Sequence, residues 1–162
     1  MAQRILFFKD IDADTISDLI AQIESRESDD VEMLLDSCGG SVTPALSFHS
    51  YVRQSGIRLN ISVIGWCYSA ALMMFCAGSV RRASRTASFL LHPVRKLFEG
   101  TFTAEQLQKE VEELRRLDII MREIFTDTVK RKRGEITSYF KQTTILDAVT
   151  AYRMGLLTEK PF

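Results

Sequence analysis

Short apolar runs alternate with amphipathic segments along this chain, and that alternation constrains the fold more than any other feature of the sequence. The apolar runs have the length and composition of buried strands and lie at Ile5–Phe8, Val31–Leu35, Ile57–Ile64 and Phe89–Leu91. Strands that alternate with helices form parallel sheets, in which each connection crosses over with a right-handed turn. The sequence therefore predicts an α/β fold.

The segments between these runs carry helical signals. Ile16, Leu19, Ile20 and Ile23 recur at the spacing of one helix face, after Asp12 or Asp14, either of which can cap a helix. Further helices are predicted over Pro44–Gln54, Ser69–Ala77, Ala104–Lys130 and Leu146–Met154. The longest has apolar residues near heptad spacing, so we expect it to pack against another subunit.

Composition excludes several classes of protein. The 162 residues suffice for about one domain. The 21 basic and 21 acidic side chains cancel, which argues against binding to nucleic acid or an anionic membrane. No apolar stretch is long enough to span a bilayer, and no signal peptide is recognisable. Cys38, Cys67 and Cys76 lack metal-site spacing, as do His49 and His92, so we expect free thiols, a cytoplasmic location, no metal and no cofactor.

Two glycine-containing turns, at 36–41 and 65–71, follow predicted strands and open predicted helices. A helix N-terminus presents unpaired N–H groups, and a serine hydroxyl beside such donors has the surroundings that acyl transfer requires. His92, at the end of the next strand, adds a general base. From the residues alone, however, such turns are more often helix caps, and a lone histidine is more often structural.

The order of these elements resembles the ClpP family of serine peptidases. Cys38-Gly39-Gly40 is similar to the family's Pro-Gly-Gly turn without its proline, and Gly65 and Ser69 match the glycine and nucleophile of the next turn. The remaining matches are Ala77-Gly78, Leu90-Leu91-His92-Pro93, Gly100, Thr103, the long helix, and Ala148 with Met154-Gly155-Leu156-Leu157. The similarity runs from about Arg4 to Leu157. It implies one domain of ClpP/crotonase-type β-β-α units, with a head at about 4–94 and 135–162 and a handle at about 95–134.

Carried over by position, the resemblance implies that Ser69 is the nucleophile and His92 the general base. The backbone N–H groups of Gly40 and Ala70 would form the oxyanion hole. The substrate would be an extended polypeptide, flanked by Ser41, Val42, Val94, Arg95 and Lys96 and read through its backbone. The resemblance also implies a homo-oligomeric assembly, either one ring or two rings stacked through the handle helix.

Three departures separate this sequence from the family pattern. Thr143 stands where the family has its catalytic aspartate, and Asp147, four residues on, either replaces it or caps a helix. The chain begins almost at the first strand, without the family's axial loops, so the sequence identifies no ATPase partner. Lys96-Leu97 replaces a flexible Gly-Gly before the handle.

Two alternatives follow. One is a catalytically impaired or inactive ring subunit with a structural or regulatory role, suggested by Thr143. The other is acyl-CoA chemistry on the related crotonase-type fold, which shares the oxyanion hole but has no Ser-His pair.

Overall fold

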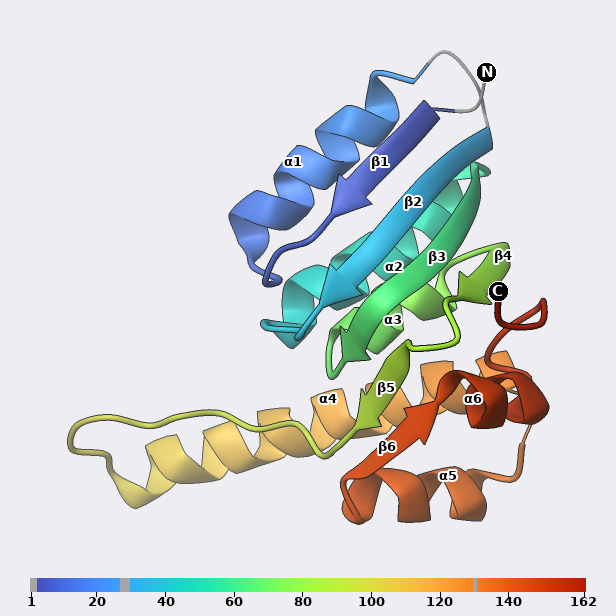
Figure 1. Ribbon diagram of the computed structural model, residues 1–162. Helices are drawn as coiled ribbons and strands as arrows, with labels where there is room; N and C mark the ends of the chain where they lie inside the picture. The colour runs from blue at the N-terminus through green and yellow to red at the C-terminus, as the bar shows by residue number, and fades with distance from the viewer. Residues whose placement is uncertain (1–2, 27–29, 130) are drawn as a thin grey trace.

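The computed structural model describes residues 3–26, 30–129 and 131–162, and within them one mixed sheet organises the molecule (Figure 1). Its strands are hydrogen-bonded in the order β1-β2-β3-β5-β6, and β4 pairs with β3 beside β5. The strands are β1 (Gln3–Phe7), β2 (Asp30–Ser37), β3 (Arg58–Tyr68), β4 (Val80–Ala83), β5 (Ser88–Leu91) and β6 (Thr144–Asp147). The pairs are parallel except β5 with β6, which confirms the predicted α/β class.

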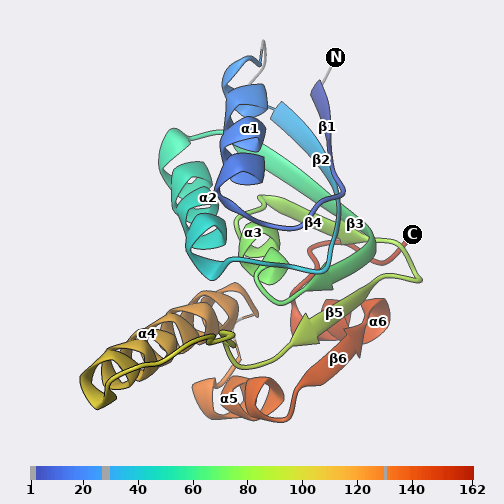
Figure 2. The same cartoon turned by 90° about the vertical axis from the view of Figure 1, so that its left-hand side faces the viewer.

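Three helices cover one face of the sheet formed by β1, β2 and β3 (Figure 2). They are α1 (Ala13–Glu24), α2 (Val42–Ser55) and α3 (Ala71–Cys76). Alternate residues of the strands point into this layer and are buried, among them Phe7, Met33 and Ile61. Every residue of α3 is buried, as its nearly continuous apolar sequence predicts.

Three more helices follow β5 in the described part of the chain, α4 (Ala104–Val129), α5 (Arg133–Lys141) and α6 (Ala148–Met154), with β6 between the last two. The N-terminal half of α4 extends away from the sheet (Figure 1), and its Leu107 and Val111 side chains are each 43% exposed. The C-terminal half is packed, with Met121 and Phe125 buried in the core. The apolar stripe of α4 is therefore covered over only part of its length. Lys130, the predicted last residue of this helix, lies outside the described residues.

The glycine expected to end the third strand does not end it, because β3 continues through Gly65 to Tyr68. A Cβ atom on Gly65 would lie 2.5 Å from Asp36 Oδ2. The same carboxylate accepts a hydrogen bond from Trp66 N at 2.8 Å through Oδ1. Gly65 thus makes room for Asp36 within a continuing strand.

Three elements have no counterpart in the sequence prediction, namely β4, α5 and β6. The predicted last helix also begins later, at Ala148 instead of Leu146, because Thr144–Asp147 pair with β5 as a strand. Gly78, which follows α3, does not have the positive φ with which a glycine often ends a helix. It packs closely instead, since a Cβ atom there would lie 3.0 Å from the Ile61 side chain.

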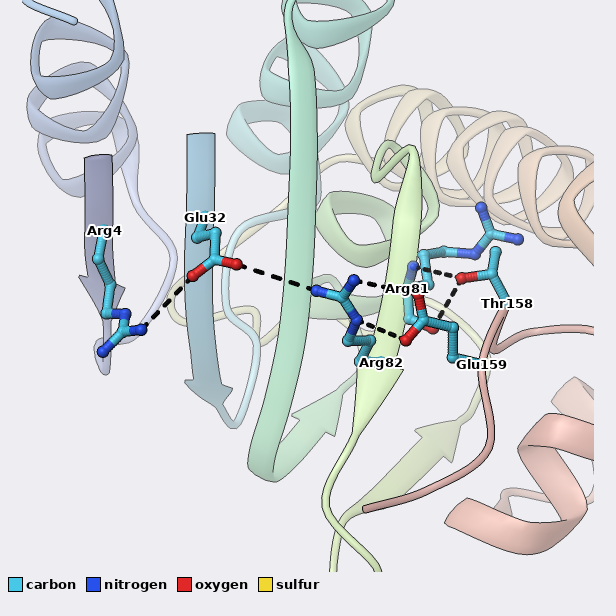
Figure 3. A network of polar contacts seen from close by, with 6 residues as sticks. All are labelled: Arg4, Glu32, Arg81, Arg82, Thr158 and Glu159. Atoms are coloured by element: carbon cyan, nitrogen blue, oxygen red, sulfur yellow. Dashed lines mark hydrogen bonds and ion pairs between the residues drawn. The ribbon is translucent and has the colours of Figure 1, made fainter. Parts of the chain in front are cut away.

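The C-terminal segment is fastened along β4, as Figure 3 shows. Thr158 N donates to Arg81 O at 2.9 Å, and Arg81 N donates to the Thr158 hydroxyl at 2.9 Å. Arg82 makes a bidentate contact with Glu159 at 2.7 and 3.0 Å, which lowers the pKa of Glu159, and it lies 4.0 Å from Glu32 on β2. The segment thereby covers the edge of a short strand that would otherwise present unpaired backbone groups.

Candidate active site

Ser69 and His92 lie at neighbouring strand ends. β3 and β5 pair in parallel, with Tyr68 opposite Leu90, and Ser69 N donates to Leu90 O at 2.9 Å. The chain leaves both strands at the same edge of the sheet, where α/β folds place their ligands. The register therefore brings the two predicted catalytic residues to one location.

Ser69 occupies a sharp turn between β3 and α3. Its φ of +57° lies in the left-handed region, which a non-glycine residue enters at some cost. Its carbonyl accepts from Leu72 N at 3.0 Å, so the turn leads directly into the buried helix α3. A strained strand-to-helix turn of this kind holds a serine side chain clear of the sheet, where it can act as a nucleophile.

The first glycine turn packs directly on Ser69 and its neighbours. A Cβ atom on Gly39 would lie 2.6 Å from Tyr68 O and 2.9 Å from Ser69 Cβ, and its φ is +98°, so only glycine fits. Ile11 fixes the same turn from the other side, donating to Gly39 O at 2.8 Å and accepting from Ser41 N at 2.7 Å. The close contact between the two turns therefore requires a residue without a side chain at position 39.

Two amides near Ser69 are available to an external acceptor. Among the hydrogen bonds of the described residues, neither Gly40 N nor Ala70 N donates to a protein atom. Gly40 lies in the turn that packs on Ser69, and Ala70 follows Ser69 directly. Backbone N–H groups beside a nucleophile can stabilise the oxyanion of acyl transfer.

His92 is held in one tautomer by the chain itself. Its Nδ1 lies 2.6 Å from Pro93 O. A carbonyl oxygen only accepts, so Nδ1 carries the proton and Nε2 is free to accept one. Within the described part of the chain no hydrogen bond joins the Ser69 hydroxyl to His92, and such catalytic contacts often tighten only when substrate binds.

Thr143, which the resemblance assigns to the place of the family's third catalytic residue, lies beside His92 but offers no carboxylate. Leu91 pairs with Thr144 in the antiparallel ladder of β5 and β6, which places Thr143 next to His92. Thr143 has a left-handed φ of +54°. Its hydroxyl accepts a long hydrogen bond from Arg95 Nη2 at 3.5 Å.

Asp147, the other predicted candidate for this role, lies at the far end of the same ladder. It pairs with Ser88, four strand positions from His92, or about 13 Å along the strand. Its carboxylate accepts from Thr150 N at 2.6 Å and caps α6, and this bond lowers the pKa of Asp147. The structure therefore does not bring Asp147 to His92.

The two buried cysteines, Cys67 and Cys76, are poor nucleophiles. Cys67, two residues before Ser69, is fully buried, and burial raises its pKa well above the ordinary value. Burial also raises the pKa of Cys76 to about 11. Both thiols stay protonated at neutral pH, whereas nucleophilic cysteines act as thiolates. Among the described residues no group of three or more His, Cys, Asp or Glu side chains is placed to hold a metal ion.

A cavity of about 350 Å³ lies between the glycine turn, the segment after His92, and α4. It is lined by Gly40, Ser41, Val42, Thr43, Val94, Arg95, Lys96, Glu110, Glu113, Leu114 and Leu117. All five residues that the resemblance placed along a substrate are among them. The sequence did not indicate that α4 residues line this cavity, because their spacing predicted only a helix that packs against another subunit. Ser69 and His92 line neither this cavity nor a larger one of about 510 Å³ between α2, α3 and α4, but only the smaller cavity includes Gly40 and the residues that follow His92.

Comparisons with known proteins agree with the resemblance found in the sequence. A family model described as "Clp protease" matches residues 1–159. The chain is 25% identical over 163 residues to "ATP-dependent Clp protease proteolytic subunit 2" of Leifsonia xyli subsp. xyli, covering 96% of this chain and 73% of the relative. It is 26% identical over 164 residues to a "Putative ATP-dependent Clp protease proteolytic subunit-like" protein of Streptomyces coelicolor, covering 97% and 78%.

A solved structure of a ClpP1 mutant from Listeria monocytogenes has the same fold. The two superpose with a TM-score of 0.87 over 98% of this chain and 90% of the other, at 16% sequence identity. The predicted ClpP-type α/β architecture is thereby confirmed. Within the described residues, no helix combines the length and apolarity needed to cross a membrane.

The placement of Asp147 predicts a structural role for its carboxylate. Asp147→Ala removes an N-cap and should lower the free energy of unfolding by about 1 kcal/mol, whereas Asp147→Asn should lower it much less. The pKa of Asp147 is lowered from its ordinary 3.8, so the stabilisation is present above about pH 4 and is lost as the pH falls through the folded value. Urea unfolding of the three proteins at pH 7 and pH 3 measures this. An equal loss for alanine at both pH values would contradict it.

Proposed function

The chain belongs to the Clp protease family, and we propose that it is a ClpP-like serine endopeptidase subunit that hydrolyses peptide bonds of extended polypeptides. One observation carries the proposal. In the register of β3 and β5, Ser69 and His92 follow neighbouring strand ends, beside two amides that donate to no protein atom among the described residues. A hydroxyl, a base and oxyanion donors are the parts that acyl transfer from a peptide requires.

In this mechanism Ser69 Oγ attacks the scissile carbonyl carbon while His92 Nε2 takes the hydroxyl proton. The carbonyl oxygen becomes an oxyanion that accepts from Gly40 N and Ala70 N. Collapse of the intermediate breaks the C–N bond, and the proton on His92 passes to the leaving amine. Water, deprotonated by His92, then hydrolyses the acyl-enzyme and restores Ser69.

The cavity beside the site suits an extended substrate. Ser41 and the start of α2 form one wall of it, and Val94–Lys96 form another. Because Val94–Lys96 has no regular secondary structure, its backbone groups other than Val94 N can pair with a polypeptide as an added strand. Strand addition reads main-chain groups at every position. The proposed substrate class is therefore broad in sequence, with side chains entering the space above Leu114 and Leu117.

A second candidate function is a catalytically impaired ring subunit. Thr143 favours it, because a threonine beside His92 cannot offset the charge of the imidazolium that forms during the reaction. In a well-studied serine protease, replacing the triad aspartate by asparagine lowers kcat by about 10⁴. The two candidates differ in whether His92 activates Ser69 in this chain.

Treatment with a serine-reactive fluorophosphonate tests the first candidate. A single adduct should form on the wild-type protein and map to Ser69 by intact-mass and peptide mass spectrometry, because His92 Nε2 activates that hydroxyl. Ser69→Ala should give no adduct, and Ser41→Ala, which alters the other glycine turn, should still be labelled. Absence of an adduct on folded wild-type protein would favour the impaired subunit.

Replacement of Thr143 separates the candidates further. Aspartate and asparagine both tolerate the left-handed backbone there, so Thr143→Asn is a matched control for Thr143→Asp. Since His92 Nδ1 already donates to Pro93 O, we expect the two variants to be labelled at rates within about threefold of each other. A triad aspartate, by comparison, can raise kcat by a factor of about 10⁴. A gain of a hundredfold or more for aspartate alone would identify a decayed triad.

Assembly into a ring is part of the proposal. The described structure leaves Leu107, Val111 and Ile119 of α4 between 43% and 48% exposed, and Leu97 in the preceding segment is 82% exposed. Apolar side chains gathered on one extended helix mark a surface for another protein. A second copy of this chain is the partner that the family supplies.

The mass of the protein in solution checks this assembly. We expect light scattering at micromolar concentration to give the molar mass of a closed ring, which is a whole-number multiple of the 18.4 kDa subunit mass. Val111→Glu should lower the measured molar mass of the assembly, because the new charge would be buried at the contact between subunits. Glu112→Gln, on the same helix, should leave the molar mass unchanged. A monomer of wild-type protein would contradict the ring.

A further inference from the structure

Residues 92–103, here called the strap, run from β5 to α4 without regular secondary structure and lie beside that helix (Figure 1). His92 is the first residue of the strap. Two side chains of α4 hold the strap close to His92: Asp118 Oδ1 accepts from Val94 N at 3.0 Å, and Glu110 pairs with Lys96. The backbone that follows the candidate base is therefore fixed by the helix.

A single peptide unit joins His92 to Asp118. Its carbonyl is Pro93 O, which accepts from His92 Nδ1 at 2.6 Å, and its amide is Val94 N, which donates to Asp118 at 3.0 Å. The bond is trans, so the carbonyl and the N–H point in opposite directions from one plane. The imidazole and the carboxylate thus lie on opposite sides of the same rigid group.

Hydrogen bonds in such a chain strengthen one another. A carboxylate that accepts from the amide draws its proton and shifts electron density toward the carbonyl oxygen. Pro93 O then becomes a stronger acceptor for the proton on His92 Nδ1. A negative charge on α4 can in this way favour the tautomer in which Nε2 is free, without touching the ring.

Asp118 is itself firmly held. Its second oxygen, Oδ2, lies 3.1 Å from Arg122 Nη2, and Arg122 Nε donates to the backbone carbonyl of Asp118 at 3.0 Å. The two side chains are only 21% and 20% exposed. Each carboxylate oxygen therefore has a fixed partner in partly buried surroundings, where hydrogen bonds to charged groups are stronger than in water.

We propose that Asp118 is a positioning residue for His92 and acts through the Pro93–Val94 peptide. It would supply from α4 the orienting carboxylate that this chain lacks at Thr143. The proposal rests on the proposed function of Ser69 and His92 for its catalytic meaning. Its structural content, the dependence of the His92 tautomer on Asp118, does not require that function.

The tautomer is measured first, in Ser69→Ala protein labelled with ¹⁵N-histidine. The chain has two histidines, so His49 provides an internal reference, and His49→Gln assigns the signals. Neutral His92 should show a protonated Nδ1 in the parent protein and a mixture of tautomers after Asp118→Ala. Asp118→Asn keeps an acceptor for Val94 N but loses the charge, so it should fall between them and tests the proposal even where alanine prevents folding.

The rate of fluorophosphonate labelling at Ser69 is the second readout. We expect Asp118→Ala to slow it by roughly 10- to 100-fold, a part of the 10²–10⁴ that a general base contributes. Asp118→Asn should lie between alanine and wild type. Glu123→Gln is the control, because Glu123 also lies on α4 and pairs with Arg133 at 3.2 Å but has no contact with the strap in the described structure.

The two readouts separate the two proposals. A tautomer that shifts with Asp118, in a protein whose Ser69 is never labelled, supports the positioning role and contradicts the peptidase. Labelling of Ser69 with an unchanged His92 tautomer in both Asp118 variants overturns the positioning role and leaves the peptidase standing. Equal slowing by Glu123→Gln would also overturn it, since the effect would then reflect the helix as a whole.

Discussion

The short parallel pairing of β3 with β5 is the interaction on which the site depends. It ends with Ser69 N bonded to Leu90 O, which fixes the residue after β3 relative to the residues after β5. A shift by one position would turn the side chains of β5 to the opposite face. The same strand also pairs with β6, so this register sets the distances of Thr143 and Asp147 from His92.

The glycine turn adds a second constraint, because it is a contact between two stretches of backbone. Gly39 packs on Tyr68 O and the Ser69 Cβ atom, while Gly40 packs on Ile11. Side chains at either position would separate the turns, and the amide of Gly40 would move away from Ser69. The glycines in this motif therefore indicate a place where two stretches of backbone lie in close contact.

The parts of the site that could be predicted are those with strong local signals. Ser69, His92 and the glycine turn follow apolar strands, and their spacing matched a family pattern. β5 is as short as β4 and β6 but was predicted, because it has three consecutive apolar residues. β4 was missed because it contains two arginines, and β6 because it has only two apolar residues. Asp118 was missed for another reason. In sequence it is an ordinary helix charge four residues before Arg122, and its contact with Val94 exists only after the strap folds back on α4.

α4 links the two proposals made for this protein. Its N-terminal half carries the exposed apolar side chains attributed to contact with another subunit, and Asp118 lies where the helix becomes packed. A helix is stiff over this length, so fixing one half restricts the other. If a second subunit covers Leu107 and Val111, the carboxylate of Asp118 is held more firmly against the strap, and with it the tautomer of His92. Assembly and catalysis would then depend on one helix, which explains how a site without a triad aspartate could still require the whole ring.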